Sequence, residues 1–264
     1  MQFIIRKLLI ILFLIIAIKI NQLKVLAQNN HNSFEDYGLI SIMYHRFNES
    51  KYPSTNIQLD IFKEQLRIIE QSGLKFIHPK DFEKSLSNNK QERKILLTID
   101  DGLLSFYKNA WPILKKRNIP FILFVNTREV GSFNYMNWEQ IIELYNNDNV
   151  EIGNHSHSHE YLVDENSEII KKDILKSIGI FKSKLGKNSL FFSYPFGEYS
   201  LEFKKIIKDF GFKYAFGQHS GVIDETKDLL ELPRFPINEK YGELKRFKSI
   251  INYYPLEYKK LLPL

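Results

Sequence analysis

The chain of 264 residues contains no cysteine. This absence excludes disulfide scaffolds, thiol catalysis, iron–sulfur clusters and zinc sites built on thiolates, so any metal would have to be held by histidine or by carboxylates. Glycine (12 residues) and proline (9 residues) are too few for a collagen-like or low-complexity chain. The remaining composition, 44% hydrophobic and 26% charged, is that of a globular protein with a large core.

A long apolar run is also missing. The N-terminal run Leu8–Ile18 has eleven residues, whereas a spanning helix needs about 20. It follows the basic stretch Met1–Lys7. Residues 25–27 have small or medium-sized side chains and offer a cleavage site, so the whole segment has the pattern of a secretory signal peptide. An uncleaved anchor is the alternative, because Lys19–Lys24 is unusually polar, and only then would the protein contact a membrane. In both cases we expect a single domain, residues 28–264, outside the cytoplasm.

The chain has no strong excess of one charge sign beyond this segment. The formal net charge is +6, but four of the 37 basic residues lie in the first 27 residues, which contain no acid. The rest of the chain contains 33 basic and 31 acidic residues. A nucleic-acid partner is therefore not expected, because the basic field that attracts phosphates is missing.

Short apolar runs alternate with segments of helical spacing in the rest of the chain. The helix around Ile170, Ile174 and Ile178 ends at Gly186, and Asp60 is expected to cap an earlier helix. Such alternation predicts a parallel sheet covered by helices, and about seven units in one domain favour an α/β barrel. The expected strands are residues 39–44, 75–77, 94–99, 120–125, 150–152, 190–192 and 212–216.

Two of these strands are followed by residues that suit metal chemistry. Asp100 and Asp101 come directly after one strand, and Gly102 lets the backbone turn there. His155 and His159 follow another strand and are four residues apart, so a tight loop can direct both at one point. Two adjacent buried carboxylates repel each other unless a cation neutralises one, and a catalytic zinc site takes three protein ligands. We therefore expect one aspartate on a metal and the other acting as a base.

Simpler interpretations exist for both segments. An Asp-Asp-Gly sequence after a strand is often only a turn with a helix cap, and a run of alternating histidines can be a solvent-exposed loop. Their joint occurrence at strand ends favours a shared metal site, because chemistry in such barrels lies at the carboxyl ends of the strands. His157, between the two ligands, is expected to point away, and His31 and His78 are expected at the surface.

The sequence resembles the polysaccharide deacetylases, the family that shares the NodB homology domain. The resemblance extends from about Leu39 to Phe247, and the first two motifs are specific in this order. Three segments resemble the family's first three motifs: Leu97–Gly102, Gly153–His159 and Phe192–Gly197. Four further stretches resemble segments found in members of this family: Met43–Phe47, Pro53–Ile57, Tyr135–Gln140 and Leu232–Pro236.

This resemblance implies a distorted (β/α) barrel that binds a divalent metal, commonly zinc. Cobalt and nickel are alternatives, because nitrogen and oxygen ligands accept all three. It also implies hydrolysis of N-acetyl groups on the N-acetylglucosamine units of a polysaccharide. By position, Asp100 would be the general base. Asp101, His155 and His159 would bind the metal, and the backbone N–H of Phe196 would help to hold the oxyanion.

The sequence departs from the commonest family pattern in two places. Ser193 stands where an arginine usually orients the base, and the late Leu-x-His motif that supplies the general acid is missing. Both departures resemble the branch that deacetylates poly-N-acetylglucosamine, in which a histidine follows the first strand. His45 occupies that place and is our candidate for the acid, with His219 as its rival. Arg234 is expected to replace the missing arginine by pairing with Asp100.

Exposed aromatic residues are expected to line a groove for the sugar rings, and the candidates are Tyr135, Trp138 and Tyr194. Two alternatives to a polysaccharide N-deacetylase stay open at this level. One is a metal-dependent deacylase of another N-acyl substrate, such as a peptidoglycan sugar. The other is a carbohydrate-binding barrel without catalysis, because a fold does not fix a function.

Overall fold

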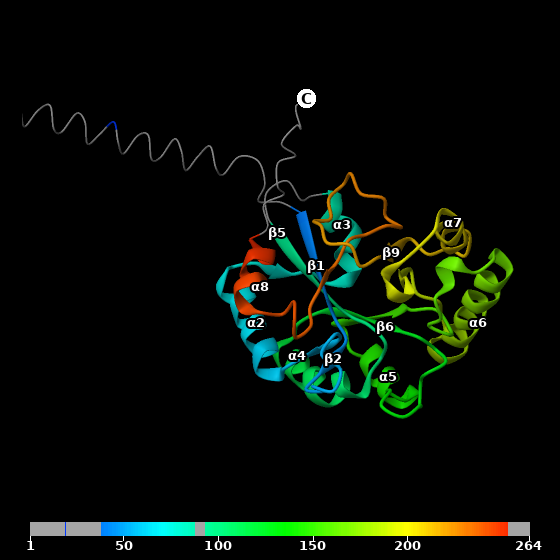
Figure 1. Ribbon diagram of the computed structural model, residues 1–264, viewed down its shortest axis with the longest axis horizontal. Coiled ribbons are helices and arrows are strands. Elements are labelled where there is room, and N and C mark those ends of the chain that lie inside the picture. Colours follow the sequence, from blue (N-terminus) through cyan, green and yellow to red (C-terminus); the bar gives the residue numbers. More distant parts are fainter. Residues whose placement is uncertain (1–18, 20–37, 88–92, 253–264) are drawn as a thin grey trace, which may run out of the picture. The chain divides into compact units, whose positions relative to one another are not determined.

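The predicted apolar runs form buried strands at nearly the predicted positions (Figure 1). The computed structural model describes residues 38–87 and 93–252, together with Lys19. Apart from Lys19, the predicted targeting segment lies outside the described residues, as does His31. None of the helices in the described part is long and apolar enough to cross a membrane.

Short strands alternate with helices along the described chain. The strands are β1 (Gly38–Tyr44), β2 (Arg46–Phe47), β3 (Asn56–Ile57), β4 (Lys75–Phe76), β5 (Arg93–Ile99), β6 (Phe121–Val125), β7 (Val150–Asn154), β8 (Phe191–Ser193), β9 (Tyr214–Phe216) and β10 (Phe235–Pro236). The helices are α2 (Leu59–Gln71), α3 (Phe82–Ser87), α4 (Trp111–Arg117), α5 (Trp138–Tyr145), α6 (Ser167–Leu185), α7 (Leu201–Asp209) and α8 (Leu244–Ile251). One π-helical segment, Phe106–Ala110, leads into α4, and short 3₁₀ turns cover Pro79–Asp81, Leu162–Asp164 and Pro195–Gly197.

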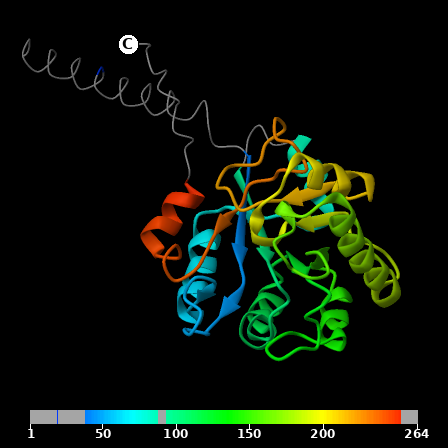
Figure 2. The ribbon, with the colours of Figure 1, turned by 45° about the vertical axis from the view of Figure 1, so that its right-hand side comes forward.

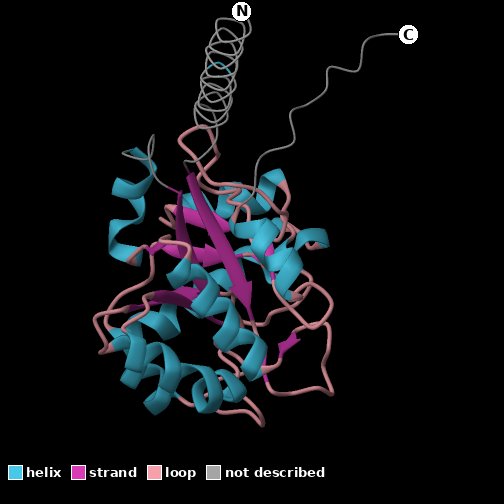
Figure 3. Ribbon diagram, turned by 90° about the vertical axis from the view of Figure 1, so that its left-hand side faces the viewer, coloured by secondary structure: helices cyan, strands magenta, loops and turns pink. Residues whose placement is uncertain are grey.

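Eight of the strands form one parallel sheet in the order β10-β1-β5-β6-β7-β8-β9, with β4 beside β5, and β2 and β3 pair in a separate two-stranded sheet. The two ends of this path are linked through the segment that leads into β10. Leu232 bridges to Phe216 of β9, and Phe235 pairs with Ile42 of β1. The predicted distorted (β/α) barrel with about seven parallel strands is thus confirmed, and helices surround the strands (Figures 2 and 3).

Alternate residues of the central strands face opposite sides of the sheet. In β6, Phe121, Leu123 and Val125 join the core beneath the outer helices, whereas Ile122 and Phe124 join a second core inside the barrel. Because both of its faces are buried, β6 is apolar throughout.

Two predicted boundaries are corrected by tertiary contacts. Asp60 does not cap α2, because the helix begins at Leu59 and the backbone N–H of Leu59 donates to Oδ1 of the distant Asn48 (2.9 Å). Strand β7 continues past residue 152 to Asn154, since Gly153 pairs with Phe124 of β6. A side chain at Gly153 would meet that phenylalanine ring at 2.3 Å, so the position needs glycine.

Candidate active site

The two aspartates lie at the carboxyl end of β5, in the middle of the sheet. The backbone N–H of Asp100 still donates to the carbonyl of Tyr44 at the end of β1 (2.9 Å). Asp101 and Gly102 then adopt positive φ values of 76° and 68°, and the chain turns sharply. This turn breaks the alternation of a strand, in which successive side chains point to opposite faces. Both carboxylates can therefore lie at the barrel mouth.

Asp101, His155 and His159 form a group whose potential ligand atoms lie within 4.8 Å of one another. Oδ1 of Asp101 is 3.5 Å from Nε2 of His155 and 3.4 Å from Nε2 of His159. That oxygen is buried and has no hydrogen-bond partner. Nδ1 of His155 contacts the carbonyl of Ser193 (2.7 Å), which directs its other ring nitrogen at the aspartate. The group has the composition and convergence of a metal site.

The charges of this group are strongly coupled. Burial raises the pKa of Asp101, but the nearby imidazoles outweigh it and hold that pKa well below its usual value. Burial lowers the pKa of His155, yet the carboxylates of Asp101 and Asp100 raise it above normal. For His159, burial and the neighbouring His155 lower the pKa. The two carboxylates thus favour a positive charge at the point where the side chains meet.

Asp100 lies beside this group and is held by Arg234, as the sequence predicts. Oδ1 and Oδ2 accept from the two terminal guanidinium nitrogens (2.8 and 2.9 Å). The hydroxyl of Ser193 also donates to Oδ2 (3.1 Å). Burial raises the pKa of Asp100, but Arg234 and His155 outweigh it, so that the pKa lies below its ordinary value. Asp100 is therefore an ionised and firmly oriented carboxylate.

Arg234 and Tyr194, which were expected to contact the substrate, are both buried. The side chain of Arg234 is 1% exposed, and its third nitrogen donates to the carbonyl of Gly217 (2.9 Å), so it orients Asp100 from below. Tyr194 is fully buried, and its hydroxyl donates to the carbonyl of Leu230 (3.0 Å). Its ring therefore offers no exposed face to a sugar. Both residues still reach the wall of the cavity described next.

A cavity of about 170 Å³ opens over the two aspartates. His45 lines it, whereas its rival His219 is exposed and is not among the lining residues. Trp138 is also absent from the lining and packs against the outer core. Besides His45, Tyr194 and Arg234, the residues that line the cavity are Met43, Ser54, Thr55, Asp100, Asp101, His155, His159, Phe196, Gly197, Gln218, Pro236, Ile237 and Asn238.

The ring of Phe196 is exposed beside the ligand group, a feature that the predicted role of its backbone N–H does not include. It has a positive φ of 59°, and its side chain is 51% exposed. The ring lies against the imidazole of His159, with centroids 4.9 Å apart. The sequence indicated only its backbone N–H. The exposed ring adds an apolar surface beside the ligand group.

Several contributors to the site carry no signal in the sequence. Asn238 lines the cavity and its amide donates to the carbonyl of Ser54 (2.8 Å), which ties two distant loops together. Asp173 of α6 accepts hydrogen bonds from two backbone N–H groups of the histidine loop.

His157 lies outside the ligand group and contacts the hydroxyl of Thr127 (2.8 Å), in agreement with the prediction that it points away.

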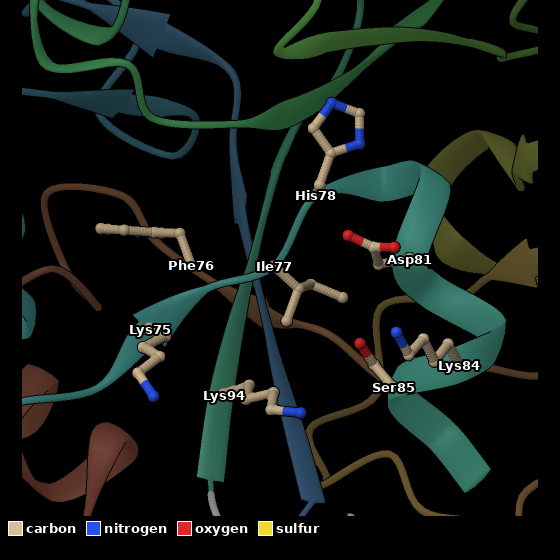
Figure 4. Close-up of a pocket in the computed structure, with 8 residues that line it drawn as sticks. All are labelled: Lys75, Phe76, Ile77, His78, Asp81, Lys84, Ser85 and Lys94. Carbon is tan, nitrogen blue, oxygen red and sulfur yellow. The ribbon is translucent and has the colours of Figure 1, made fainter. Parts of the chain in front are cut away.

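A second hollow of about 270 Å³ lies at the opposite end of β5 (Figure 4). Lysines from three elements border it, namely Lys75 of β4, Lys84 of α3 and Lys94 of β5. None of the residues predicted to carry the chemistry lines this hollow. Its lining includes His78, which we expected at the surface and which is half-buried.

Residues 87–215 match the family model described as polysaccharide deacetylase. This stretch of the chain, just under half of its length, resembles a polysaccharide deacetylase domain. Within it the three motif segments meet at the cavity: Asp100 and Asp101 come from the first, His155 and His159 from the second, and Phe196 from the third.

The chain is also similar to individual deacetylases and to a solved structure. A poly-beta-1,6-N-acetyl-D-glucosamine N-deacetylase of Staphylococcus epidermidis is 27% identical over 191 residues, 67% of this chain and 66% of that protein, so the chain spans slightly less than two thirds of it. The enzyme of the same name from Staphylococcus aureus is 25% identical over 84% of this chain and 81% of its own length. The structure of IcaB from Ammonifex degensii superposes with a TM-score of 0.74 at 26% identity, covering 82% of this chain and 98% of that one.

Proposed function

We propose that the protein is a metal-dependent hydrolase that removes N-acetyl groups from the N-acetylglucosamine units of a poly-N-acetylglucosamine. The observation that carries this proposal is the convergence of Asp101, His155 and His159 beside the oriented carboxylate of Asp100. The names of the staphylococcal relatives support the choice of substrate. The secretory pattern of the first 27 residues supports a location outside the cytoplasm, with membrane contact only if that segment is retained.

The residues present fit a divalent ion. Two imidazoles and one carboxylate are a usual ligand set for catalytic zinc, and cobalt and nickel accept the same donors. Ligands of a tetrahedral zinc ion at about 2.0–2.1 Å are roughly 3.3 Å apart. The distances from Asp101 to His155 and His159, 3.5 and 3.4 Å, are close to that spacing. A bound ion would supply positive charge that acidifies water and polarises an amide carbonyl.

The side chains around this site divide the proton transfers between them. Asp100, kept ionised by Arg234, would accept a proton from the attacking water. The backbone N–H of Phe196 would donate to the carbonyl oxygen as negative charge develops there. His45, across the cavity, would give a proton to the departing nitrogen as the carbon–nitrogen bond breaks. The products are acetate and a free glucosamine unit.

Acetate release from β-1,6-linked N-acetylglucosamine oligomers tests the proposal. We expect a chelator to abolish release and added zinc or cobalt to restore it. Asp101→Asn should lose both bound metal and activity, whereas Asp100→Asn should keep the metal and lose turnover. Asp60→Asn, on the exposed side of α2, is the matched control and should behave as wild type.

Three results would count against the proposal. Wild-type rates from Asp100→Asn would contradict its role as base. Acetate released only from a peptidoglycan fragment would indicate another N-acyl substrate. Binding of the oligomer at full metal occupancy without any acetate release would indicate a carbohydrate-binding barrel.

A further inference from the structure

The loop that carries the two histidines, residues 155–159, has a backbone that its own residues do not favour. Ser156 and His159 both adopt positive φ, 66° and 54°. Residues other than glycine enter this left-handed region rarely, because their Cβ atom crowds the backbone. Such conformations persist where the surrounding structure over-determines them. The direction of the two imidazoles therefore depends on what holds this loop.

A carboxylate from another element holds the middle of the loop. The backbone N–H of His157 donates to Oδ1 of Asp173 (2.7 Å), and the backbone N–H of Ser158 donates to Oδ2 (3.0 Å). One side chain thus fixes two consecutive amides that lie between the two predicted metal ligands. Hydrogen bonds to an ionised acceptor are stronger than neutral ones.

Helix α6 is itself fastened to the strand that precedes the loop. Ser177 lies one turn after Asp173 on the same face of the helix, and its hydroxyl exchanges hydrogen bonds with the side chain of Asn154 (3.0 and 3.1 Å). Ile174 and Ile178 of the same helix are buried in the core beside β8. Because these contacts fix the helix, Asp173 is presented to the loop from a rigid support.

We propose that Asp173 is a positioning residue of the metal site: it fixes the 155–159 loop so that both imidazoles converge on Asp101. This inference rests on the proposed function, because it concerns the same site. Asp173 acts through the backbone of His157 and Ser158 and touches neither substrate nor metal. Losing it would let the loop relax and separate the two histidines.

The test compares metal affinity in three full-length variants. Asp173→Asn keeps the shape but replaces one acceptor oxygen by an amide that cannot accept. Asp173→Glu keeps both oxygens and serves as the rescue. Asn166→Ala is the matched control, because Asn166 caps the same helix and also accepts two backbone N–H groups, from Glu168 and Ile169. Zinc affinity is measured by calorimetry on metal-free protein, cobalt coordination by its visible absorption, and stability by thermal melting without metal.

We expect Asp173→Asn to weaken zinc binding by about 10- to 100-fold, as is typical when a residue that orients ligands is lost. Its cobalt spectrum should change, and Asp173→Glu should regain part of the affinity. Asn166→Ala should lower the melting temperature similarly yet keep wild-type affinity. Wild-type affinity in Asp173→Asn, or an equal loss of affinity in the control, would overturn the inference and leave the proposed function intact. A wild-type protein that binds no zinc would instead overturn the proposed function itself.

Discussion

Replacing Arg234 by methionine should destabilise the protein strongly, because it leaves the buried carboxylate of Asp100 without its positively charged partner. The side chains of Arg234 and Asp100 are 1% and 3% exposed, and two parallel hydrogen bonds of 2.8 and 2.9 Å join them. Methionine fills much of the space between the rings of Phe124 and Phe216, which flank the guanidinium, but it cannot pair with the carboxylate. Removing one partner of a buried ion pair costs about 3–5 kcal/mol.

Urea unfolding of metal-free protein measures this effect through a double-mutant cycle. Arg234→Met should lower the free energy of unfolding by about 3–5 kcal/mol, whereas adding Asp100→Asn removes the stranded charge. The double variant should therefore be more stable than the sum of the single effects by about 1–3 kcal/mol. Arg67→Met, which breaks an exposed pair with Glu64, is the control and should change stability little. Strict additivity of the two substitutions would refute the reasoning.

Two further predictions concern the acid and the barrel interior. His45→Ala should lower kcat for acetate release by about 10²- to 10⁴-fold, the usual contribution of a general acid, whereas His219→Ala should leave it near wild type. The reverse pattern would exchange their roles. Gly153→Ala would place a Cβ atom 2.3 Å from the ring of Phe124. We expect it to lower the free energy of unfolding by about 1–3 kcal/mol, as overpacking does, and an unchanged urea midpoint would contradict this.

The fold could be predicted largely because its signals are local. Apolar runs of strand length, separated by amphipathic stretches, required a parallel sheet covered on both faces. The predicted boundaries of helices and strands were wrong where a residue distant in the sequence makes the deciding contact. Helix α2 takes its cap from Asn48 and not from Asp60, and β7 lengthens because Gly153 fits against Phe124. No local pattern contains those partners.

The sequence alone determined which residue types reach the barrel mouth. Asp100, Asp101, His155 and His159 directly follow strands, and parallel strands end at the same edge of a sheet. Residue types and spacing left open which aspartate faces the imidazoles, and only the family resemblance distinguished the two. In the structure the positive φ of Asp101 brings its carboxylate to both histidines.

Only the tertiary structure decided how residues from far along the chain meet, although the family resemblance had already indicated the Arg234–Asp100 pair and His45. Arg234 reaches Asp100 across 134 positions because the segment before β10 returns to β1. His45 faces the cavity while His219 remains exposed, and Tyr194 is enclosed in the core. Asp173 holds the histidine loop from a helix that begins eight residues after it. The physical reason is that the direction of a side chain follows the short repeat of its own strand or helix, whereas convergence of distant residues on one point requires the folded, curved sheet.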